Sequence, residues 1–424
     1  MIKETKPTAY WNGSTAIAFC IGSLPLMMAL APLSFSPYPA GWQIFVQFHS
    51  LIVPLILFAI IFIVLREGGS VVKGWQGLPL LSRIAFLSWT PLVLFATFRT
   101  GNDHLSAAIG VLSLGAIALL FLSMAHRSSY ATDDFQRKMW LAIGFGVLMY
   151  FVVFATYILS NHIEPAKWYG PFPGFHNIRH VAFLGFVAYG AGLHSFMAAP
   201  NRHAQNWVSV AALVPSIAGL VVVFWTGSRG PTLALLLLTI SIFAIVPEKR
   251  KAIAGFALMT GVPALMIVSL LPLPIPMFGL FSAFGISDVN SATLDDASSG
   301  RLQIWLATFD SICERPILGW GLGQYLKFNP LGEGALAHPH NSILQMTFVA
   351  GISGIIFSLL IAVPMMFSRF NFSNSPSARF HLAMLFALMV YSLYDGILFY
   401  NFPITIFTLT VIGVLKKPFL ARSG

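Results

Sequence analysis

Apolar residues form long runs along most of this chain, and polar residues gather in the stretches between them. A helix that crosses the hydrocarbon core of a bilayer needs about 20 consecutive, mainly apolar residues. We therefore predict an all-α polytopic membrane protein with about 12 transmembrane helices. The predicted spans are residues 14–33, 43–65, 79–98, 105–125, 139–160, 181–199, 207–226, 230–247, 252–271, 342–368, 378–399 and 402–415.

Composition supports a membrane location for the whole chain. Hydrophobic residues make up 57% of the 424 residues and charged residues 9%, whereas soluble domains carry about 25% charged residues. We expect one integral membrane domain over residues 1–424. The first apolar run ends without a small-residue cleavage site, so we expect it to be a retained span. One cysteine lies in that run and the other in a distant polar stretch, which predicts neither a disulfide nor a thiolate metal site.

The positions of the basic residues predict the orientation. Of 24 Lys and Arg residues, 17 fall in one set of alternate connections. The other set holds only Arg99, Lys167, Arg179, Arg229, Arg301, Arg315 and Lys327. Because basic residues are retained on the cytoplasmic side, both termini are predicted to be cytoplasmic. The formal net charge of +10 then reflects topology and contact with membrane lipids, and no nucleic-acid partner is expected.

The longest predicted outer connection is residues 272–341, between the ninth and tenth spans. Connections of this length are usually functional or disordered, and we expect this outer loop to form part of a functional site. Within it, Leu302, Trp305, Phe309 and Ile312 recur at helical spacing. This pattern predicts a short amphipathic helix at the membrane surface, ended by Pro316, with Trp305 as an interfacial anchor.

Three outer arginines are candidates for binding an anion. Arg229 lies in the tight turn TGSRGP, beside a predicted helix N-terminus that favours negative charge. Arg301 begins the amphipathic helix, where a cation opposes the helix dipole unless an anion lies between them. Arg179 precedes a span together with His176 and His180. The alternatives are a snorkelling Arg229, a solvated Arg301 and an Arg179 paired with Glu164.

The stretch HPHNSILQ places two imidazoles directly before the tenth span. Ser342 and Gln345 have the spacing of a capping box, which predicts that the helix begins at Ser342. His340 would then lie just outside the positive end of a helix, which favours the neutral ring and suits a general base. Gly351 and Gly354 follow on the same predicted helix and would let a neighbouring helix pack closely.

The acidic residues of the outer connections lack the paired spacing of a metal site. Cations and neutral bases predominate there instead. This combination favours a bound anionic lipid, such as a lipid pyrophosphate, and predicts neither a metal nor another cofactor.

The order of these motifs resembles that of the O-antigen ligase and polymerase superfamily. The sequence SRG follows a span, Arg301 and Trp305 come next, and RPILGWGLGQY follows them. The pattern HN-x9-GxxG is then met by His340, Asn341, Gly351 and Gly354. The motifs extend over about residues 220 to 365, and the predicted number of spans extends the resemblance to the whole chain.

The resemblance implies a GT-C-like glycosyltransferase of the bacterial inner membrane with a periplasmic active site. An O-antigen ligase moves glycan from an undecaprenyl pyrophosphate carrier to lipid A–core without a metal. A repeat-unit polymerase, which transfers to another carrier-linked unit, is the alternative. The short loop near residues 160–180 favours the ligase. A 12-span transporter is a third reading, but no matching halves are visible in the sequence.

The chemistry of such a transfer assigns roles to the candidate residues. A base must take the proton of the acceptor hydroxyl, and fixed cations must stabilise the departing pyrophosphate. Direct displacement with one base predicts inversion at the anomeric carbon. His340 is the expected base, and His338 is the second candidate. The expected pyrophosphate ligands are Arg229, Arg301 and Arg179, and the supporting residues are Asn341, His180 and Trp305.

Overall fold

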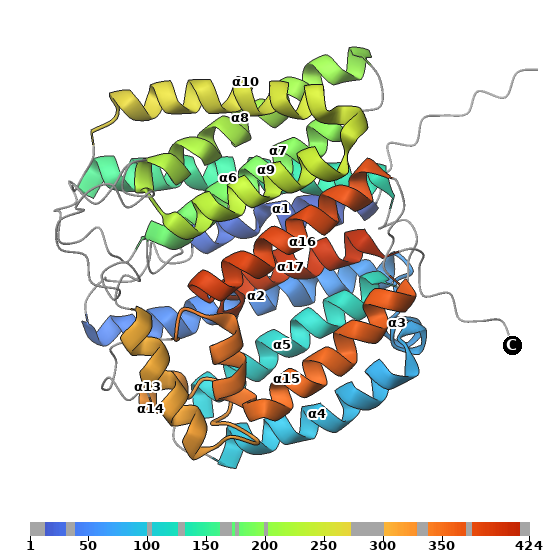
Figure 1. Ribbon diagram of the computed structural model, residues 1–424, viewed down its shortest axis with the longest axis vertical. Coiled ribbons are helices and arrows are strands. Elements are labelled where there is room, and N and C mark those ends of the chain that lie inside the picture. Colours follow the sequence, from blue (N-terminus) through green and yellow to red (C-terminus); the bar gives the residue numbers. More distant parts are fainter. Residues whose placement is uncertain are drawn as a thin grey trace, which may run out of the picture.

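The computed structural model describes residues 13–30, 39–99, 104–125, 132–161, 172–173, 178–198, 202–272, 301–328, 338–369 and 375–415. These residues are almost entirely helical (Figure 1). The helices are α1 (Gly13–Leu30), α2 (Pro39–Arg66), α3 (Val71–Gly77), α4 (Leu80–Arg99), α5 (His104–Ala125), α6 (Asp133–Asn161), α7 (Ile178–Met197), α8 (Arg202–Thr226), α9 (Arg229–Ile245), α10 (Arg250–Leu270), α13 (Arg301–Glu314), α14 (Tyr325–Phe328), α15 (Ser342–Arg369), α16 (Pro376–Asp395) and α17 (Asn401–Val414). Short 3-10 turns, η4 (Pro247–Lys249) and η5 (Ile397–Phe399), join two of the helix pairs.

Every predicted span overlaps one of the helices that the structure describes. Among the described residues, seven helices are long and apolar enough to cross a membrane. An eighth would be α2 with α3, which meet at a bend of 87°. The remaining apolar helices of the described part are shorter: Thr15–Met28, Val210–Thr226, Arg229–Ile245 and Asn401–Val414. The chain is therefore an all-α polytopic membrane protein, and a total of twelve spans stays a prediction.

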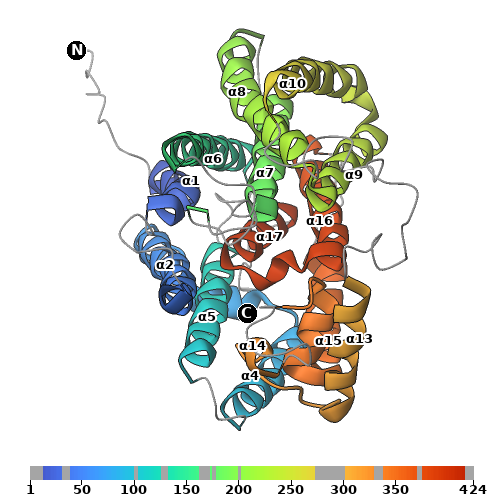
Figure 2. The ribbon, with the colours of Figure 1, turned by 90° about the vertical axis from the view of Figure 1, so that its left-hand side faces the viewer.

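Helix α7 forms the centre of the larger half of the bundle. Figure 2 shows it surrounded by α6, α8, α9, α16 and α17. Its membrane-span window is 94% buried, which agrees with a helix that is apolar on all sides. The corresponding share is 22% for α4 and for the span that contains α10. Those outer helices expose large apolar side chains such as Leu258, Met266 and Leu270, because their surroundings are lipid rather than water.

Helix α15 is broken at Gly351, which corrects the expectation of one helix carrying Gly351 and Gly354 against a neighbouring helix. Gly351 has φ 62° and ψ −162°. The backbone next to Gly351 bonds to the loop after α13: Ile352 N donates to Pro316 O at 2.7 Å. Trp320 N donates to Phe348 O at 2.8 Å on the other side of the break. Gly351 thus packs against the backbone of the loop after α13. The hydrogen bonds of this loop on both sides of the break hold α13 beside α15.

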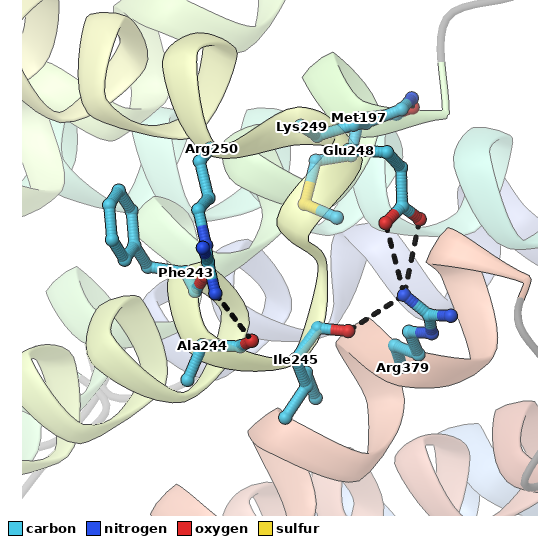
Figure 3. A network of polar contacts seen from close by, with 8 residues as sticks. All are labelled: Met197, Phe243, Ala244, Ile245, Glu248, Lys249, Arg250 and Arg379. Atoms are coloured by element: carbon cyan, nitrogen blue, oxygen red, sulfur yellow. Dashed lines mark hydrogen bonds and ion pairs between the residues drawn. The ribbon is translucent and has the colours of Figure 1, made fainter.

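Basic side chains bind the carbonyl end of α9, as Figure 3 shows. Arg379 Nη1 donates to Ile245 O at 2.7 Å and contacts both carboxylate oxygens of Glu248 at 3.2 Å. Arg250 Nε donates to Phe243 O at 3.0 Å. These contacts satisfy carbonyl groups that a helix C-terminus leaves unpaired, and they place cations at its negative end. The basic cluster therefore has a structural role at the end of the bundle opposite α13 (Figure 1).

The break at Gly351 predicts a specific sensitivity to substitution. A Cβ there would lie 2.3 Å from the carbonyl of Ile317, and the residue has positive φ. Gly351→Ala should lower the free energy of unfolding by at least the ~1–3 kcal/mol of a strained backbone position. Gly261→Ala is the matched control, because a Cβ at Gly261 meets nothing within 4 Å. Thermal unfolding in detergent measures both, and equal melting temperatures would show that the break tolerates a side chain.

Candidate functional site

The tight turn after α16 supplies two polar groups that were not among the predicted site residues. Helix α16 ends at Asp395, and Gly396 follows in the left-handed conformation with φ 46°. The turn η5 then leads to Tyr400, directly before α17. A Cβ at Gly396 would lie 2.8 Å from His338 Nδ1 and 3.0 Å from Asn341 N. Glycine thus lets the turn approach the HPHN segment closely.

Asp395 is the centre of the site. Its side chain is 3% exposed, and its Oδ1 accepts a hydrogen bond from His340 Nδ1 at 3.1 Å. Arg301 Nη2 lies 3.8 Å from the same oxygen. One carboxylate therefore joins a histidine and an arginine from two separate segments of the chain. A buried carboxylate needs such partners, because an unpaired charge away from water is costly.

The two candidate histidines lie side by side. Their ring centroids are 4.3 Å apart. His338 is 2% exposed, and its Nε2 lies 2.8 Å from the Tyr400 hydroxyl. The side chain of His340 is 17% exposed. Among the described non-glycine residues, only His340 has positive φ, 54°. The more accessible ring therefore belongs to the residue with the less common backbone conformation.

Helix α15 begins at Ser342, as predicted, but its cap is Asn341. The Asn341 Oδ1 accepts from Ile343 N at 2.9 Å and from Leu344 N at 3.1 Å. Within the described part of the chain, Ser342 Oγ and Gln345 Oε1 have no hydrogen-bond partner. The predicted Ser342–Gln345 capping box is therefore wrong, because Asn is an equally good cap one residue earlier. Asn341 acts by fixing the helix start next to His340.

Arg301 occupies a buried position on α13. Its side chain is 5% exposed, and its guanidinium lies 4.2 Å from the ring centroid of Tyr394. Its Nε and Nη1 are buried and lack a hydrogen-bond partner among the described residues. Two unmet donors on a buried cation are costly, and they are suited to an anionic ligand. The reading of Arg301 as a solvated residue is wrong.

Helix α13 turns its polar face toward the protein. Its buried residues include Thr308 and Ser311, whereas Leu306 is 59% and Phe309 57% exposed. Such an inverted amphipathic helix fits a lipid surface. Trp305 has a contact that the sequence did not predict, because its Nε1 donates to Pro339 O at 2.9 Å. This bond connects α13 to the loop that carries both histidines.

The N-terminus of α9 approaches the site through Gly230. A Cβ there would lie 2.4 Å from Cε2 of Tyr391, on α16. Arg229 is the first residue of α9 and is half-buried. Ser228 Oγ and the Tyr391 hydroxyl are buried and have no hydrogen-bond partner among the described residues. Unmet hydroxyl donors therefore lie beside the helix terminus that the sequence predicts to bind an anion.

The start of α7 provides the last predicted residues of the site. The ring centroid of His180 lies 4.2 Å from that of Tyr400. Arg179 is close enough for its charge to act on Asp395. His176 and Glu164 lie outside the described residues, so the predicted Arg179–Glu164 pair stays a prediction. The structure thus gathers His338, His340, Arg301 and the Arg179–His180 pair around Asp395 and Tyr400, with Arg229 at the adjoining helix end.

This arrangement can accept a proton and bind an anion. A histidine held by a carboxylate through Nδ1 leaves Nε2 as an acceptor, and none of the described residues forms a hydrogen bond with Nε2 of His340. Burial and the nearby carboxylate of Asp395 raise the pKa of Tyr400, so its phenol stays protonated. Among the described residues, no group of three His, Cys, Asp or Glu side chains could hold a metal.

Asp395 and Tyr400 were not predicted as site residues, although the segment YDGILFYN carries a signal for them. It places an acidic residue at the end of an apolar span. An ionisable residue at membrane depth suggests function by default. Its partners, however, come from α13 and the HPHN loop, and no sequence spacing connects these segments.

The shared carboxylate predicts how substitutions affect stability. Asp395→Ala leaves the Arg301 guanidinium buried without its counter-charge, which should cost about 3–5 kcal/mol of unfolding free energy. The double variant Arg301→Met with Asp395→Leu removes both charges and should lose less than the single variant. Thermal unfolding in detergent compares the three proteins. A double variant that is less stable than Asp395→Ala would contradict the pairing.

Comparison with known proteins agrees with the motif order. Residues 212–359 match the family model described as O-Antigen ligase. A protein of Rickettsia conorii named "Putative polysaccharide ligase" is 32% identical over 90 residues, which is 18% of this chain and 22% of that protein. The matched stretch thus spans about a fifth of that relative. The family match contains Arg229, Arg301, both histidines and the break at Gly351. Residues 212–359 of this chain are therefore similar to the O-antigen ligase family.

Proposed function

We propose that this protein is an O-antigen ligase, a glycosyltransferase that moves glycan from undecaprenyl pyrophosphate to lipid A–core. The observation that carries the proposal is the joining of His340 and Arg301 through Asp395. A base and a buried cation with unmet donors then lie beside the same carboxylate oxygen. The family match to O-antigen ligases supports the same substrate class.

His340 acts as the general base. Its Nδ1–H is held by Asp395, so Nε2 can take the proton of the acceptor hydroxyl. The hydroxyl oxygen then bonds to the anomeric carbon, and the bond from that carbon to the pyrophosphate oxygen breaks. The electron pair of the broken bond remains on the pyrophosphate. Asp395 stabilises the imidazolium that forms, and attack opposite the leaving group inverts the anomeric carbon.

Fixed cations stabilise the charge that develops on the pyrophosphate. Arg301 has two unpartnered nitrogens that can donate to the phosphate oxygens. Arg229 and Arg179 add positive charge from the starts of α9 and α7. Donors that are already oriented need no reorganisation during the reaction. The reaction therefore requires no metal or other cofactor in this proposal.

The protein would act as a multi-pass enzyme of the bacterial inner membrane, with both termini in the cytoplasm. The positive-inside distribution supports this orientation. The proposed site would then face the periplasm. The Arg379, Arg250 and Lys249 contacts, at the other end of the bundle, agree with a cytoplasmic end rich in basic residues.

Replacement of the base should strongly slow transfer. Because general base catalysis contributes about 10²–10⁴-fold, His340→Ala should lower kcat by that factor with purified protein, carrier-linked glycan and lipid A–core. The variant should still insert into the membrane and bind carrier lipid. His104→Gln is the matched control, because His104 is an exposed residue at the start of α5. Normal capping of lipid A–core in the His340→Ala strain would disprove the assignment.

Gene deletion distinguishes the ligase from a repeat-unit polymerase of the same chemistry. Loss of a ligase leaves lipid A–core uncapped and long glycan attached to the carrier. Loss of a polymerase leaves single repeats on lipid A–core. Electrophoresis of lipopolysaccharide, with extraction of carrier-linked glycan, measures both. Single repeats on core in the deletion strain would assign the polymerase. Solute uptake by the purified protein in liposomes would instead favour the transporter.

A further inference from the structure

Both ring nitrogens of His338 are engaged, and they are engaged differently. The backbone N–H of His340 donates to His338 Nδ1 at 3.1 Å. A ring nitrogen that accepts a hydrogen bond carries no proton. The proton of the neutral ring is therefore on Nε2, which lies 2.8 Å from the Tyr400 hydroxyl. His338 donates to that oxygen and has no ring nitrogen left to accept a substrate proton.

His340 has the opposite tautomer. The Asp395 carboxylate can only accept, so His340 Nδ1 carries the proton in the 3.1 Å contact with Oδ1. Its Nε2 then holds the lone pair. The two rings, 4.3 Å apart, are thus chemically distinct although they share one short loop. Only one of them has the lone pair of a base available.

The bond from His338 constrains the backbone of its neighbour. His340 adopts φ 54°, a left-handed conformation that most side chains avoid. The hydrogen bond from the His340 N–H to His338 Nδ1 holds this conformation. The left-handed Gly396 lies against the same two residues, since a Cβ added to it would be 2.8 Å from His338 Nδ1 and 3.1 Å from His340 Cα. His338 is held in turn by Tyr400, which precedes α17. These contacts thus connect the orientation of the base to the start of α17.

We propose that His338 and Tyr400 form a positioning pair that holds the His340 backbone in its left-handed conformation and directs Nε2 of His340 at the acceptor hydroxyl. The effect of this pair on catalysis rests on the proposed function, whereas the contacts that define the pair do not. It removes His338 from the candidate bases and gives it a separate role. It also adds Tyr400, which touches both His338 and His180, to the residues on which transfer depends.

Four variants separate positioning from proton transfer. His338→Asn places an amide oxygen near the position of Nδ1 and keeps the acceptor for the His340 N–H. His338→Gln keeps a donor near Nε2. His338→Ala removes both, and Tyr400→Phe removes only the hydroxyl while keeping the ring beside His180. Thermal unfolding in detergent accompanies each variant, so that a loss of activity is read only for folded protein.

The expected result is a graded effect on kcat. His338→Ala and Tyr400→Phe should lower kcat by about 10–100-fold, by analogy with the loss of residues that orient metal-ligating side chains. Their combination should cost much less than the product of the two, because both act through one contact chain. His338→Asn should recover most of the loss and keep the acidic limb of the pH profile of kcat. A His338→Asn variant as inactive as His340→Ala, with that limb lost, would overturn the inference.

Nitrogen-15 NMR of histidine-labelled protein in lipid tests the same inference without activity. Difference spectra against His338→Asn and His340→Gln assign the two residues. The expected spectrum shows Nδ1 of His338 unprotonated and Nδ1 of His340 protonated. A protonated Nδ1 on His338 overturns the positioning pair even if transfer proceeds normally. If wild-type protein shows the expected tautomers but transfers no glycan, the proposed function fails and the positioning geometry stands.

Discussion

The site depends on one buried carboxylate at the end of a transmembrane helix. Asp395 lies where α16 leaves the bundle, and it contacts the HPHN loop and α13. Without it, Arg301 would be a buried cation without a counter-charge, and His340 would lose the partner that fixes its tautomer. A single ionisable group at membrane depth therefore organises segments that are distant in the sequence. The cost of burying it is offset by partners from two separate segments of the chain.

The position of the helices followed from the sequence because the solvent is lipid. A hydrocarbon surrounding requires every backbone group to bond within its own helix, so apolar length alone predicts where helices form. Each of the twelve predicted segments contains a helix for this reason. The break at Gly351 was not predicted, because it depends on a loop from residues 316–321 that enters α15. The glycine signals a close approach, but the sequence does not identify the approaching partner.

The candidate site was predicted unevenly. The arginines and histidines of the predicted outer connections were identified because a cation there departs from the positive-inside distribution and is costly to place without a partner. Asp395, Tyr400 and Tyr391 did not stand out, since each is one polar residue in an apolar segment. The role of Asn341 was also misplaced, because Asn341 and Ser342 are adjacent and both cap helices well. Which of them is used depends on the backbone at His340, and that conformation is set by tertiary contacts.

The distances around Asp395 show how one carboxylate could serve the proposed base and the proposed anion site together. His340 lies at hydrogen-bond distance, 3.1 Å, whereas Arg301 lies at 3.8 Å from the same oxygen. The histidine is therefore bound in a defined direction, while the guanidinium is balanced in charge but keeps Nε and Nη1 for other acceptors. A tighter, bidentate Arg301–Asp395 pair would have used one of those donors as well as Nη2. The looser contact leaves the cation buried, compensated and still able to bind phosphate oxygens.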